Sequence, residues 1–423
     1  MSSGCNNNVG FTMQYDVVVI GAGPAGSTAA KNLAEKNITV LLLDKAMFPR
    51  DKPCGGGLPT RVMKRFAYIE PFIDSISYGT TMYSSSLRYK FDFIREKPFL
   101  LMTLRKEFDN GLLSLAQKAG VIFQAGKSVV DVLIQKEKAI VMLEDGETIE
   151  TQVVIGCDGM HSIVAEKTKL AKKLEVLCIS LMQEQPMTAK ELSTFFTKKR
   201  LAYLFIKAQG VAGYGWVFPK KNCVNIGIGE FQSAISKARP KIPLKETYEH
   251  FISLLKEKKL LPADFPIENL RGATLPIFPL DNTYGDRVLL CGDAAGFINP
   301  ITGEGIYYAM ASGQIAAQVV ADSLQKKDLS RRSLCRYQNL WITDFGKDLK
   351  ALGRFNNQWG MDSEKIIRMM TYDKKFAKLI IGVTGGQISF TKYKKALIIR
   401  YIYIFLKNIF RKKEKKWRKS SLF

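Results

Sequence analysis

The stretch Tyr15-Asp-Val-Val-Val-Ile20-Gly21-Ala-Gly23-Pro24-Ala25-Gly26 decides the fold class of this chain. Its first half reads as a continuous apolar strand of the kind that is buried on both faces of a parallel sheet. The glycines follow at once with the spacing GxGxxG and lead into a helical pattern, and a second apolar strand, residues 38–43, ends in Asp44. This order of strand, glycine turn, helix, strand and acid predicts a dinucleotide-binding fold.

Each residue of the motif has an expected task. Gly21 permits the tight turn, Gly23 lets a pyrophosphate approach the backbone, and Gly26 lets the helix lie against the strand. The helix N-terminus offers free N–H groups and a positive dipole end to phosphates. Asp44 can accept hydrogen bonds from a ribose, which favours NAD or FAD over NADP. The plain alternative is a glycine-rich turn in some other α/β protein.

The composition narrows the class of protein. With 423 residues, of which 46% are apolar and 24% charged, the chain has the mixture of one large or two modest globular domains. Seven scattered cysteines without a CxxC pair indicate a reducing compartment rather than a disulfide framework. The two histidines, His161 and His250, lack metal-ligand spacing, so we expect no metal site. The first fourteen residues do not resemble a signal peptide, and no apolar run reaches eighteen residues.

Further along, the parallel-sheet pattern stops and then returns. Residues 153–157 read as a buried strand that ends in the turn Asp158-Gly159. The aromatic-rich runs between residues 171 and 270 predict an antiparallel substrate sheet. Residues 287–291 are again a buried strand, and it places Asp293 at its carboxyl end, where such sheets bind ligands. Gly303 and Gly305 then open a second helix with a positive N-terminus.

The expected fold class is therefore α/β (α+β overall), with a Rossmann-type nucleotide-binding domain, an inserted antiparallel substrate sheet and a helical C-terminal region. We expect a polar arm (1–14), a discontinuous nucleotide-binding domain (15–80, 101–170 and 271–325), a substrate-binding sheet domain (81–100 and 171–270), a helical region (326–391) and a basic tail (392–423).

The run Pro53-Cys54-Gly55-Gly56-Gly57-Leu58-Pro59 is expensive to order, because three consecutive glycines lose much backbone entropy on folding. Such a turn is expected where something must approach bare main chain.

Together these residues resemble the FAD-dependent oxidoreductases with the aromatic-hydroxylase fold, over roughly residues 15–325. Two segments are similar to the geranylgeranyl reductase family in particular: the turn Lys52–Gly57, and the run Tyr214-Gly-Trp-Val-Phe-Pro219 with Asn225-Ile-Gly-Ile-Gly229 after it. The resemblance implies an FAD-dependent reductase that saturates geranylgeranyl-type double bonds in a membrane lipid, a quinone or a related prenyl compound. Its electron donor would be NAD(P)H or reduced ferredoxin.

The resemblance also implies roles for individual residues. Asp44 and Arg105 would contact FAD, Asp293 would bind the ribityl chain, and the Cys54–Gly57 turn would pass the isoalloxazine. The substrate pocket would be lined by Tyr214, Trp216, Phe218 and Pro219. The full cofactor-binding set would be Gly21, Gly23, Ala25, Gly26, Asp44, Cys54, Gly55, Gly56, Gly57, Arg105, Val129, Asp158, Asp293, Gly303, Gly305 and Ile306.

One departure concerns the turn Asp158-Gly-Met-His-Ser-Ile-Val-Ala165, because the group commonly has an arginine where this chain has Ala165. The contribution of this turn to nicotinamide docking is therefore open.

The expected chemistry explains the residue types. An isolated alkene is electron-rich, so its reduction needs a proton on one carbon while a hydride reaches the other. Aromatic faces stabilise transient positive charge, which suits Trp216 and Tyr214 as catalytic pocket residues. Cys54 could donate the proton, or it could act only as a wedge that positions the ring. Alternation alone would make Tyr214–Phe218 an ordinary core strand.

The C-terminal tail carries nearly half of the net charge of +24. Residues 392–419 contain twelve basic residues and one acid, a difference of +11. A helix over 396–410 places Arg400, Lys407 and Arg411 on one stripe among apolar residues, which favours a helix lying in the headgroup region of an anionic membrane. We expect a cytoplasmic protein at the inner face of the cell membrane. A solvated tail is the alternative, and nucleic acid is not expected because no groove-reading motif accompanies the charge.

Two other functions are open at this point. One is a flavin monooxygenase or halogenase of the same fold. The other is a membrane-docked flavin carrier without an organic substrate.

Overall fold

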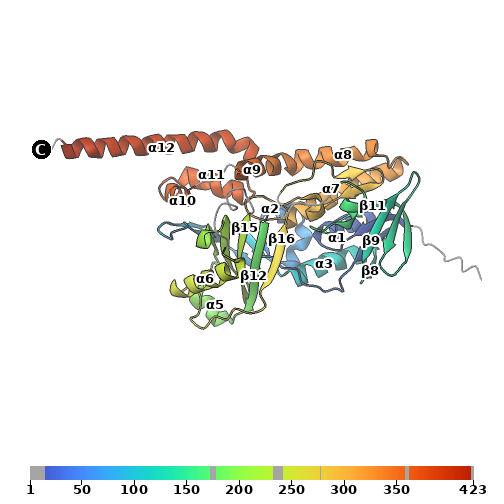
Figure 1. Cartoon of the computed structure of the whole chain (residues 1–423), viewed down its shortest axis with the longest axis horizontal. Coiled ribbons are helices and arrows are strands. Elements are labelled where there is room, and N and C mark those ends of the chain that lie inside the picture. The colour runs from blue at the N-terminus through green and yellow to red at the C-terminus, as the bar shows by residue number, and fades with distance from the viewer. Residues whose placement is uncertain (1–14, 172–177, 232–241, 277, 358–361, 421–423) are drawn as a thin grey trace, which may run out of the picture.

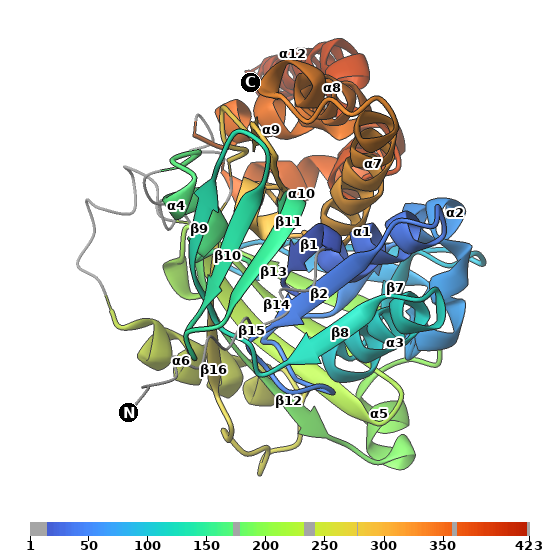
Figure 2. The ribbon, with the colours of Figure 1, turned by 90° about the vertical axis from the view of Figure 1, so that its right-hand side faces the viewer.

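Two large sheets and a group of C-terminal helices make up the molecule (Figures 1 and 2). The computed structural model describes residues 15–171, 178–231, 242–276, 278–357 and 362–420. The α/β class expected from the sequence, with a Rossmann-type domain and an inserted sheet, is confirmed.

The first sheet has the strand order β17-β18-β11-β1-β2-β8. Its central pairs β11–β1, β1–β2 and β2–β8 are parallel, and Val17, Val18 and Val19 are fully buried, as continuous apolar strands require. From β11 the sheet continues as an antiparallel meander through β10 and β9 (Figure 2). The strands are β1 (Tyr15–Ile20), β2 (Val40–Asp44), β8 (Ile122–Ala125), β9 (Val129–Ile134), β10 (Ala139–Leu143), β11 (Thr148–Gly156), β17 (Tyr284–Gly285) and β18 (Val288–Leu290).

Helices α1 and α7 pack tightly against each other beside this sheet. A Cβ atom at Gly313 of α7 would overlap the carbonyl oxygen of Ala25 in α1, so the close approach requires a glycine there. The helices of this part are α1 (Pro24–Ala34), α2 (Arg61–Arg65), α3 (Arg105–Lys118), α4 (Ile163–Lys167), α7 (Ile306–Gln325) and α8 (Arg331–Trp341), with 3₁₀ turns η1 (Ala67–Phe72) and η4 (Gly292–Ala295).

The second sheet has the order β16-β12-β15-β14-β13-β5-β6 and is antiparallel except for the pair β13–β5. One face packs against α6 through a core that includes Tyr248 and Phe251. Its strands are β5 (Gly79–Tyr83), β6 (Lys90–Ile94), β12 (Cys178–Pro186), β13 (Ala202–Ile206), β14 (Gly213–Pro219), β15 (Cys223–Phe231) and β16 (Arg271–Leu275), with α5 (Ala189–Phe195), η2 (Ala208–Gly210) and α6 (Leu244–Glu257).

The domain layout stays a proposal, but two of its boundaries need adjustment. Strand β16 pairs with β12, so the boundary expected before residue 271 cuts the second sheet, and the boundary expected after residue 80 divides β5 of the same sheet. The aromatic-rich runs of residues 171–270 end before β16, and for this reason the sequence pattern assigned β16 to the other domain.

A small sheet joins the two large ones. It has the order β3-β7-β4 and carries the end of the triglycine turn, because β3 begins at Gly57. Its strands are β3 (Gly57–Pro59), β4 (Ser75–Ser77) and β7 (Leu100–Met102).

The C-terminal helices cover one end of the second sheet. Phe376 and Ile381 share a core with Phe99 and Met82, which come from the sheet side. The last helix extends past its neighbours and projects from the body (Figure 1). The elements are η5 (Ile342–Gly346), α9 (Lys347–Asn357), α10 (Ser363–Tyr372), α11 (Lys374–Thr384) and α12 (Phe390–Ser420).

Candidate active site

The GxGxxG loop between β1 and α1 has one open side. A Cβ atom at Gly21, where φ is +100°, would overlap the carbonyl oxygen of Cys157, and one at Gly26 would overlap the carbonyl oxygen of Gly21. A Cβ atom at Gly23 would meet only the Nη2 atom of Arg50, at 3.5 Å. Gly21 and Gly26 are thus required by packing, whereas Gly23 leaves bare backbone beside a cation.

Asp44 closes the other side of this loop. Its carboxylate accepts hydrogen bonds from the backbone N–H groups of Ala22 and Ala46, both at 2.8 Å. The N–H of Lys127 donates to the Asp44 carbonyl at 3.0 Å, and Val129 begins β9 two residues later. Asp44 and Val129 therefore lie at the same end of the sheet.

A buried ion pair is connected to the GxGxxG loop through Arg50. The guanidinium of Arg105 donates two hydrogen bonds, of 2.8 and 2.7 Å, to the fully buried carboxylate of Asp109, and Arg50 donates a third at 2.8 Å. Burial raises the pKa of Asp109, but the charges of Arg105 and Arg50 lower it by more, so the net shift is downward. Arg105 was expected to contact a cofactor, but two of its nitrogens donate hydrogen bonds to Asp109.

Asp293 lies shortly after the strand end, as the strand pattern predicted, and belongs to η4, with its carboxylate close to the start of helix α7. Lys52 Nζ is 3.1 Å from its carboxylate, and the position of a Cβ atom at Gly305 is 3.4 Å from Oδ1. Helix α7 begins after Gly305, which offers no side-chain cap. The start of α7, where the N–H of Tyr307 donates to the Glu304 carboxylate at 2.7 Å, thus faces the same corner as Asp293.

The triglycine turn packs against aromatic rings. Cβ atoms at Gly55 and Gly57 would lie 3.2 and 3.1 Å from the Phe218 ring, and the one at Gly55 also 3.2 Å from Trp216 Nε1. At Gly56 φ is +73°, and a Cβ atom there would overlap the carbonyl oxygen of Thr103. The need for bare backbone thus already follows from the protein's own side chains.

Between this turn and the second sheet lies a cavity of about 250 Å³. The even-numbered face of β14, which carries Tyr214, Trp216 and Phe218, forms the wall on the side of the sheet, and Trp216 and Phe218 also contact the turn. The loop 299–306 and the end of α11, up to Gly386, complete the wall. Pro219 is buried but does not line the cavity. The lining is predominantly apolar, which suits a hydrocarbon ligand.

Hydrogen bonds fix the aromatic wall. Trp216 Nε1 donates to Asn225 Oδ1 at 2.8 Å, and Asn225 Nδ2 donates to the carbonyl oxygen of Cys54 at 3.1 Å. The hydroxyl of Tyr214 donates to the carbonyl oxygen of Thr302. Because burial also raises the pKa of Tyr214, this hydroxyl keeps its proton at neutral pH.

Two charged groups interrupt the apolar lining. The Glu304 carboxylate lies 3.5 Å from Arg61 Nη2, and the Arg61 guanidinium stacks over the Tyr307 ring at 4.0 Å. Burial raises the pKa of Glu304 by more than the Arg61 charge lowers it. The carboxylate also accepts a hydrogen bond from the N–H of Tyr307 at 2.7 Å, so Glu304 is a buried carboxyl group with a raised pKa that is fixed in place beside the cavity.

Comparisons with known proteins agree with this geometry. Residues 14–330 match the family model of the FAD binding domain. The chain is 34% identical to the geranylgeranyl diphosphate reductase of Rhodobacter capsulatus, over 92% of this chain and 94% of the relative. It is 33% identical to the digeranylgeranylglycerophospholipid reductase of Methanocaldococcus jannaschii, over 77% of this chain and 82% of the relative.

The chain belongs to the geranylgeranyl reductase family.

A solved structure of this kind has the same fold. The geranylgeranyl bacteriochlorophyll reductase-like protein of Thermoplasma acidophilum superposes with a TM-score of 0.76 at 23% identity, over 90% of this chain and 99% of the other. Flavin-dependent halogenases also match, at 18% identity, and share the fold alone.

The residues of this family member fit FAD. The open side of Gly23, the uncapped N-terminus of α1 and the guanidinium of Arg50 would hold the pyrophosphate. Asp44 lies where the adenosine ribose would bind, and Lys52 and Asp293 where the ribityl chain would pass. The N-terminus of α7, with Gly303, Gly305 and Ile306, would face the ring edge.

Two expected cofactor residues have other contacts in the structure. The Asp158 carboxylate accepts hydrogen bonds from Ser162 Oγ at 2.6 Å and from the N–H of Val164 at 3.1 Å, at the start of α4. Ala25 lies buried in α1, against Gly313 of α7. A role of either residue toward the cofactor stays a proposal.

Five residues at this site were missed from the sequence: Arg50, Arg61, Lys220, Asn225 and Glu304. Asn225 gave a signal, since it is a polar residue within the apolar run of β15. The other four are charged residues, which single-sequence patterns assign to solvent.

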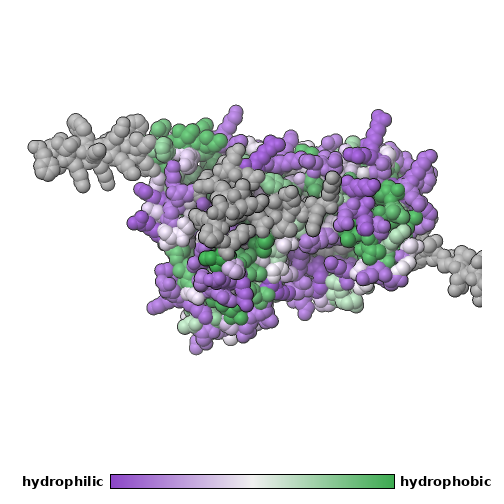
Figure 3. Space-filling model, in the orientation of Figure 1, coloured by the Kyte–Doolittle hydropathy of each residue, from purple (hydrophilic) through white to green (hydrophobic). Residues whose placement is uncertain are grey.

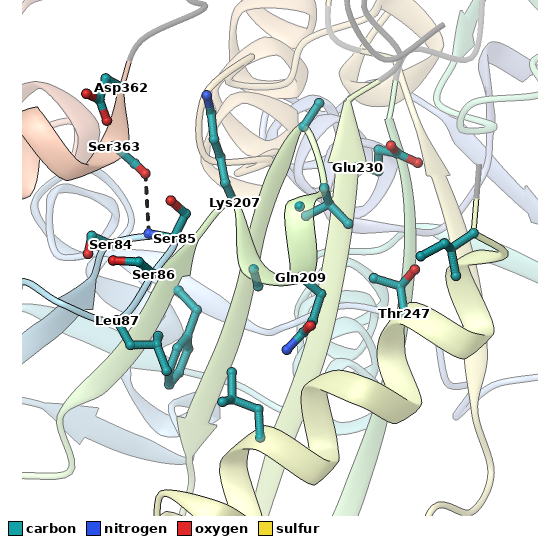
Figure 4. A pocket seen from close by; sticks show the side chains of 17 residues that line it. Ser84, Ser85, Ser86, Leu87, Lys207, Gln209, Glu230, Thr247, Asp362 and Ser363 are labelled. Atoms are coloured by element: carbon teal, nitrogen blue, oxygen red, sulfur yellow. Dashed lines mark hydrogen bonds between the residues drawn. The ribbon is translucent and has the colours of Figure 1, made fainter. Parts of the chain in front are cut away.

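A second cavity, of about 640 Å³, lies on the opposite face of the same sheet (Figure 4). Side chains alternate along β13, so Leu204 and Ile206 line the first cavity while Phe205 faces the second. Hydroxyl groups such as those of Ser84, Ser85 and Ser86 border it, and the N–H of Ser85 donates to Ser363 Oγ at 3.3 Å. None of the expected site residues reaches this second cavity.

Within the described residues no group of three possible metal ligands was found.

Proposed function

We propose that the protein is an FAD-dependent reductase that saturates double bonds in the isoprenoid chains of a membrane lipid, a quinone or a related prenyl compound. The observation that carries the proposal is the apolar cavity between the triglycine turn and the aromatic face of β14, with the FAD-side loop 299–306 as its third wall. Two relatives support this substrate class, because they are named as a geranylgeranyl diphosphate reductase and a digeranylgeranylglycerophospholipid reductase.

The chain's own residues would hold an alkene for this reaction. Bound FAD, once reduced by the electron donor, would supply the hydride. Apolar side chains exclude water from the cavity, and the rings of Tyr214, Trp216 and Phe218 offer π faces to positive charge that develops on the alkene. The bond of Tyr214 to the Thr302 carbonyl keeps this aromatic wall next to the loop 299–306.

Two side chains of the cavity wall are candidates for the proton. Cys54 was expected from the sequence, and its sulfur accepts a hydrogen bond from the N–H of Gly56 at 3.3 Å. Glu304 is the second candidate, because burial raises the pKa of its carboxyl group. Comparing Cys54→Ser with Glu304→Gln in single-turnover reduction decides between them: loss of the donor slows the chemical step with little change in substrate affinity.

The test of the reductase is direct. The purified protein should be yellow, and after anaerobic reduction its flavin should be reoxidised by a geranylgeranyl phospholipid or diphosphate, with a product heavier by about 2 mass units per saturated bond. Oxygen consumption coupled to substrate would instead indicate a monooxygenase, and a further need for halide a halogenase. Flavin that no prenyl compound reoxidises would indicate the carrier.

The electron donor is proposed to be NAD(P)H or reduced ferredoxin. Anaerobic mixing with each donor in turn, followed at the flavin absorbance, identifies it by its rate of bleaching.

We also propose that α12 docks on an anionic membrane surface. Six apolar residues on one face of the helix are 43–67% exposed, and Figure 3 shows apolar side chains gathered there. The opposite face packs on the body through Leu397 and Ile404. Only three residues separate the cavity wall at Gly386 from the first residue of α12, so a docked helix places the cavity near the lipid. The exposed residues are Ile398, Ile399, Ile402, Tyr403, Phe405 and Leu406.

One expected feature of the tail differs. Arg400 lies on the packed side, where its guanidinium donates hydrogen bonds of 2.7–3.1 Å to Asp373 of α11's first turn. It therefore orients the helix rather than reaching for lipid, and lipid attraction is left to cations such as Lys394, Lys395 and Lys407. Arg411 lies among residues whose side chains are not described. No helix within the described ranges combines the length and the apolar character that crossing a bilayer demands.

Vesicle binding tests this proposal. Replacing Ile399, Ile402 and Leu406 together with Ser should reduce sedimentation with vesicles that contain phosphatidylglycerol at least tenfold, while Ile94→Ser, which alters an exposed isoleucine of β6 outside this helix, should leave it unchanged. Equal binding of all forms would refute docking. Fractionation of cells then tests the proposed cytoplasmic, peripheral location at the inner face of the cell membrane.

A further inference from the structure

Lys220 directly follows the Tyr214–Pro219 run, and its side chain has no exposed surface at all. A lysine buried this completely requires a partner charge and hydrogen bonds, because an isolated ammonium group is strongly destabilised away from water. The structure supplies both. Its placement next to the cavity wall raises the question of what the charge holds in place.

Lys220 connects two strands of the second sheet to the triglycine turn. Its ammonium group forms an ion pair with Glu184 of β12 and donates a hydrogen bond of 2.8 Å to the carbonyl oxygen of Thr103. Thr103 in turn donates to the carbonyl oxygen of Gly56, from its N–H at 2.8 Å and from Oγ1 at 3.2 Å. The backbone N–H of Lys220 donates to Cys223 at 2.8 Å, which anchors the lysine at the β14–β15 connection.

The connection ends at Gly56, the residue of the turn with a positive φ. The Lys220 nitrogen lies 3.0 Å from the position of a Cβ atom at Gly56, so the ammonium group and the Thr103 carbonyl together occupy the space beside that glycine. On either side of it, Gly55 and Gly57 rest against Phe218. A displacement of Lys220 would thus change the spacing between the turn and the aromatic wall.

A second connection runs in parallel, from Asn225 Nδ2 to the Cys54 carbonyl. The two connections reach the turn two residues apart, at Cys54 and through Thr103 at Gly56. The turn is therefore held to the second sheet at two points, and the width of the cavity follows from both.

We propose that Lys220 is a positioning residue that sets the distance between the triglycine turn and the aromatic face of β14, and thereby the width of the slot that admits an isoprenoid chain. The inference rests on the proposed function for the identity of the ligand. The placement of the turn itself does not depend on it. Lys220 acts through Thr103 and Gly56, and it does not line the cavity.

The test replaces both members of the ion pair, so that an effect on the position of the turn can be distinguished from a failure to fold. The double variant Lys220→Met, Glu184→Leu leaves no unpaired buried charge, and exchange of a buried ion pair for apolar residues is often neutral for stability. The matched control is Lys199→Met, Glu96→Leu, an exposed pair of 2.6 Å on the same domain. Lys220→Arg keeps the positive charge with a different shape.

Three measurements are made on the FAD-loaded full chain. We expect amide exchange over residues 53–60 and at Thr103 to increase at least tenfold in the double variant and not in the control. We expect kcat with geranylgeranyl diphosphate to fall at least tenfold while the affinity for FAD changes less than threefold. Lys220→Arg should recover part of kcat. If the double variant folds and its exchange and kcat both stay within twofold of the wild type, the proposal is wrong.

The outcomes also separate this inference from the proposed function. A wild type that does not turn over any prenyl substrate refutes the reductase, while increased exchange in the turn of the double variant still supports the positioning role. A wild type that turns over, with a double variant that matches it in exchange and rate, refutes only the role of Lys220.

Discussion

The two glycine clusters of this molecule are enclosed in different ways. At Gly21 and Gly26 a Cβ atom would strike main-chain carbonyls within the same small motif or its neighbouring strand. At Gly55 and Gly57 it would meet the side chain of Phe218, from a strand about 160 positions further along the chain. The first cluster belongs to a local backbone design, whereas the second is shaped by the substrate side of the fold.

Each cluster also has its own buried ion pair. Arg105 and Asp109 are four residues apart on α3, so one helix turn brings them together. Glu184 lies on β12 and Lys220 directly follows β14, 36 residues further along the chain. The comparison teaches that the ion pair near the GxGxxG loop forms within one helix, whereas the pair near the triglycine turn joins distant segments, and each prediction below tests one part of this contrast.

The largest effect is expected for Gly26→Ala. The added Cβ atom overlaps the backbone of Gly21, which cannot move aside, so we expect a loss of about 4 kcal/mol or more and a colourless, poorly folded protein. The matched variant is Gly23→Ala, whose Cβ atom meets only the end of Arg50 at 3.5 Å; it should fold normally and bind FAD more weakly. Thermal unfolding and FAD titration measure both. If Gly23→Ala is the less stable variant, the assignment of the open side is wrong.

The next effect concerns Asp109→Asn. The net pKa shift of Asp109 is downward, so the folded state holds the proton more weakly than the unfolded chain, and the carboxylate stabilises the fold above pH about 4. This stability is lost as the pH falls through the folded-state pKa. Removing the charge leaves Arg105 buried without its partner, which costs about 3–5 kcal/mol near neutral pH.

Urea unfolding from pH 3 to pH 7 measures this prediction. The difference between wild type and Asp109→Asn should be largest at pH 6–7 and shrink toward pH 3. A difference that is constant over this range would show that the pKa of Asp109 is the same in the folded and the unfolded chain, which would contradict the downward shift. The exposed pair Lys31–Glu35 provides the control, because Glu35→Gln should change stability by less than about 1 kcal/mol at every pH.

A smaller loss is expected for Gly56→Ala. It combines a positive φ with an overlap on the Thr103 carbonyl, for which we expect about 2–3 kcal/mol and a reduced kcat. Gly55→Ala faces the side chains of Phe218 and Trp216 at 3.2 Å, and these can shift by a few tenths of an ångström. It should therefore change the KM for the prenyl substrate more than the stability. Melting curves and steady-state kinetics of the two variants test this. A larger loss of stability in Gly55→Ala than in Gly56→Ala would contradict the prediction.

The same contrast explains what could be predicted from the sequence. The strand pair β1–β2, the GxGxxG loop and Asp44 all lie within residues 15–44, so their geometry follows from short-range patterns. Tyr214, Trp216 and Phe218 were assigned to a pocket only through resemblance to a family, since alternation alone describes a core strand. The structure does place them on the cavity side of β14.

The remaining contacts of the site depend on large separations. Asn225 reaches Cys54 across 171 positions, and Arg61 reaches Glu304 across 243. A single sequence does not contain the register that brings such residues together, and a lysine such as Lys220 is ordinarily exposed. The turn was predicted to need bare backbone, but the aromatic rings that also require it came only from the structure.

The smallest effect is expected for Trp216→Phe, which keeps an aromatic face and removes one hydrogen bond. Asn225 Oδ1 loses its donor, for a loss of about 1–2 kcal/mol, and the partner amide is then less firmly held toward the Cys54 carbonyl. Tyr248→Phe is the control, because it removes a hydrogen bond to the Ile226 carbonyl on the opposite face of the sheet. Both variants should lose stability, but only Trp216→Phe should raise the KM for the prenyl substrate, since only that bond connects the aromatic wall to the turn. An equal change of KM in the two variants would contradict this prediction. It would mean that loss of a hydrogen bond on either face of the sheet affects the substrate site equally, and that the bonds from Trp216 through Asn225 to Cys54 have no special role.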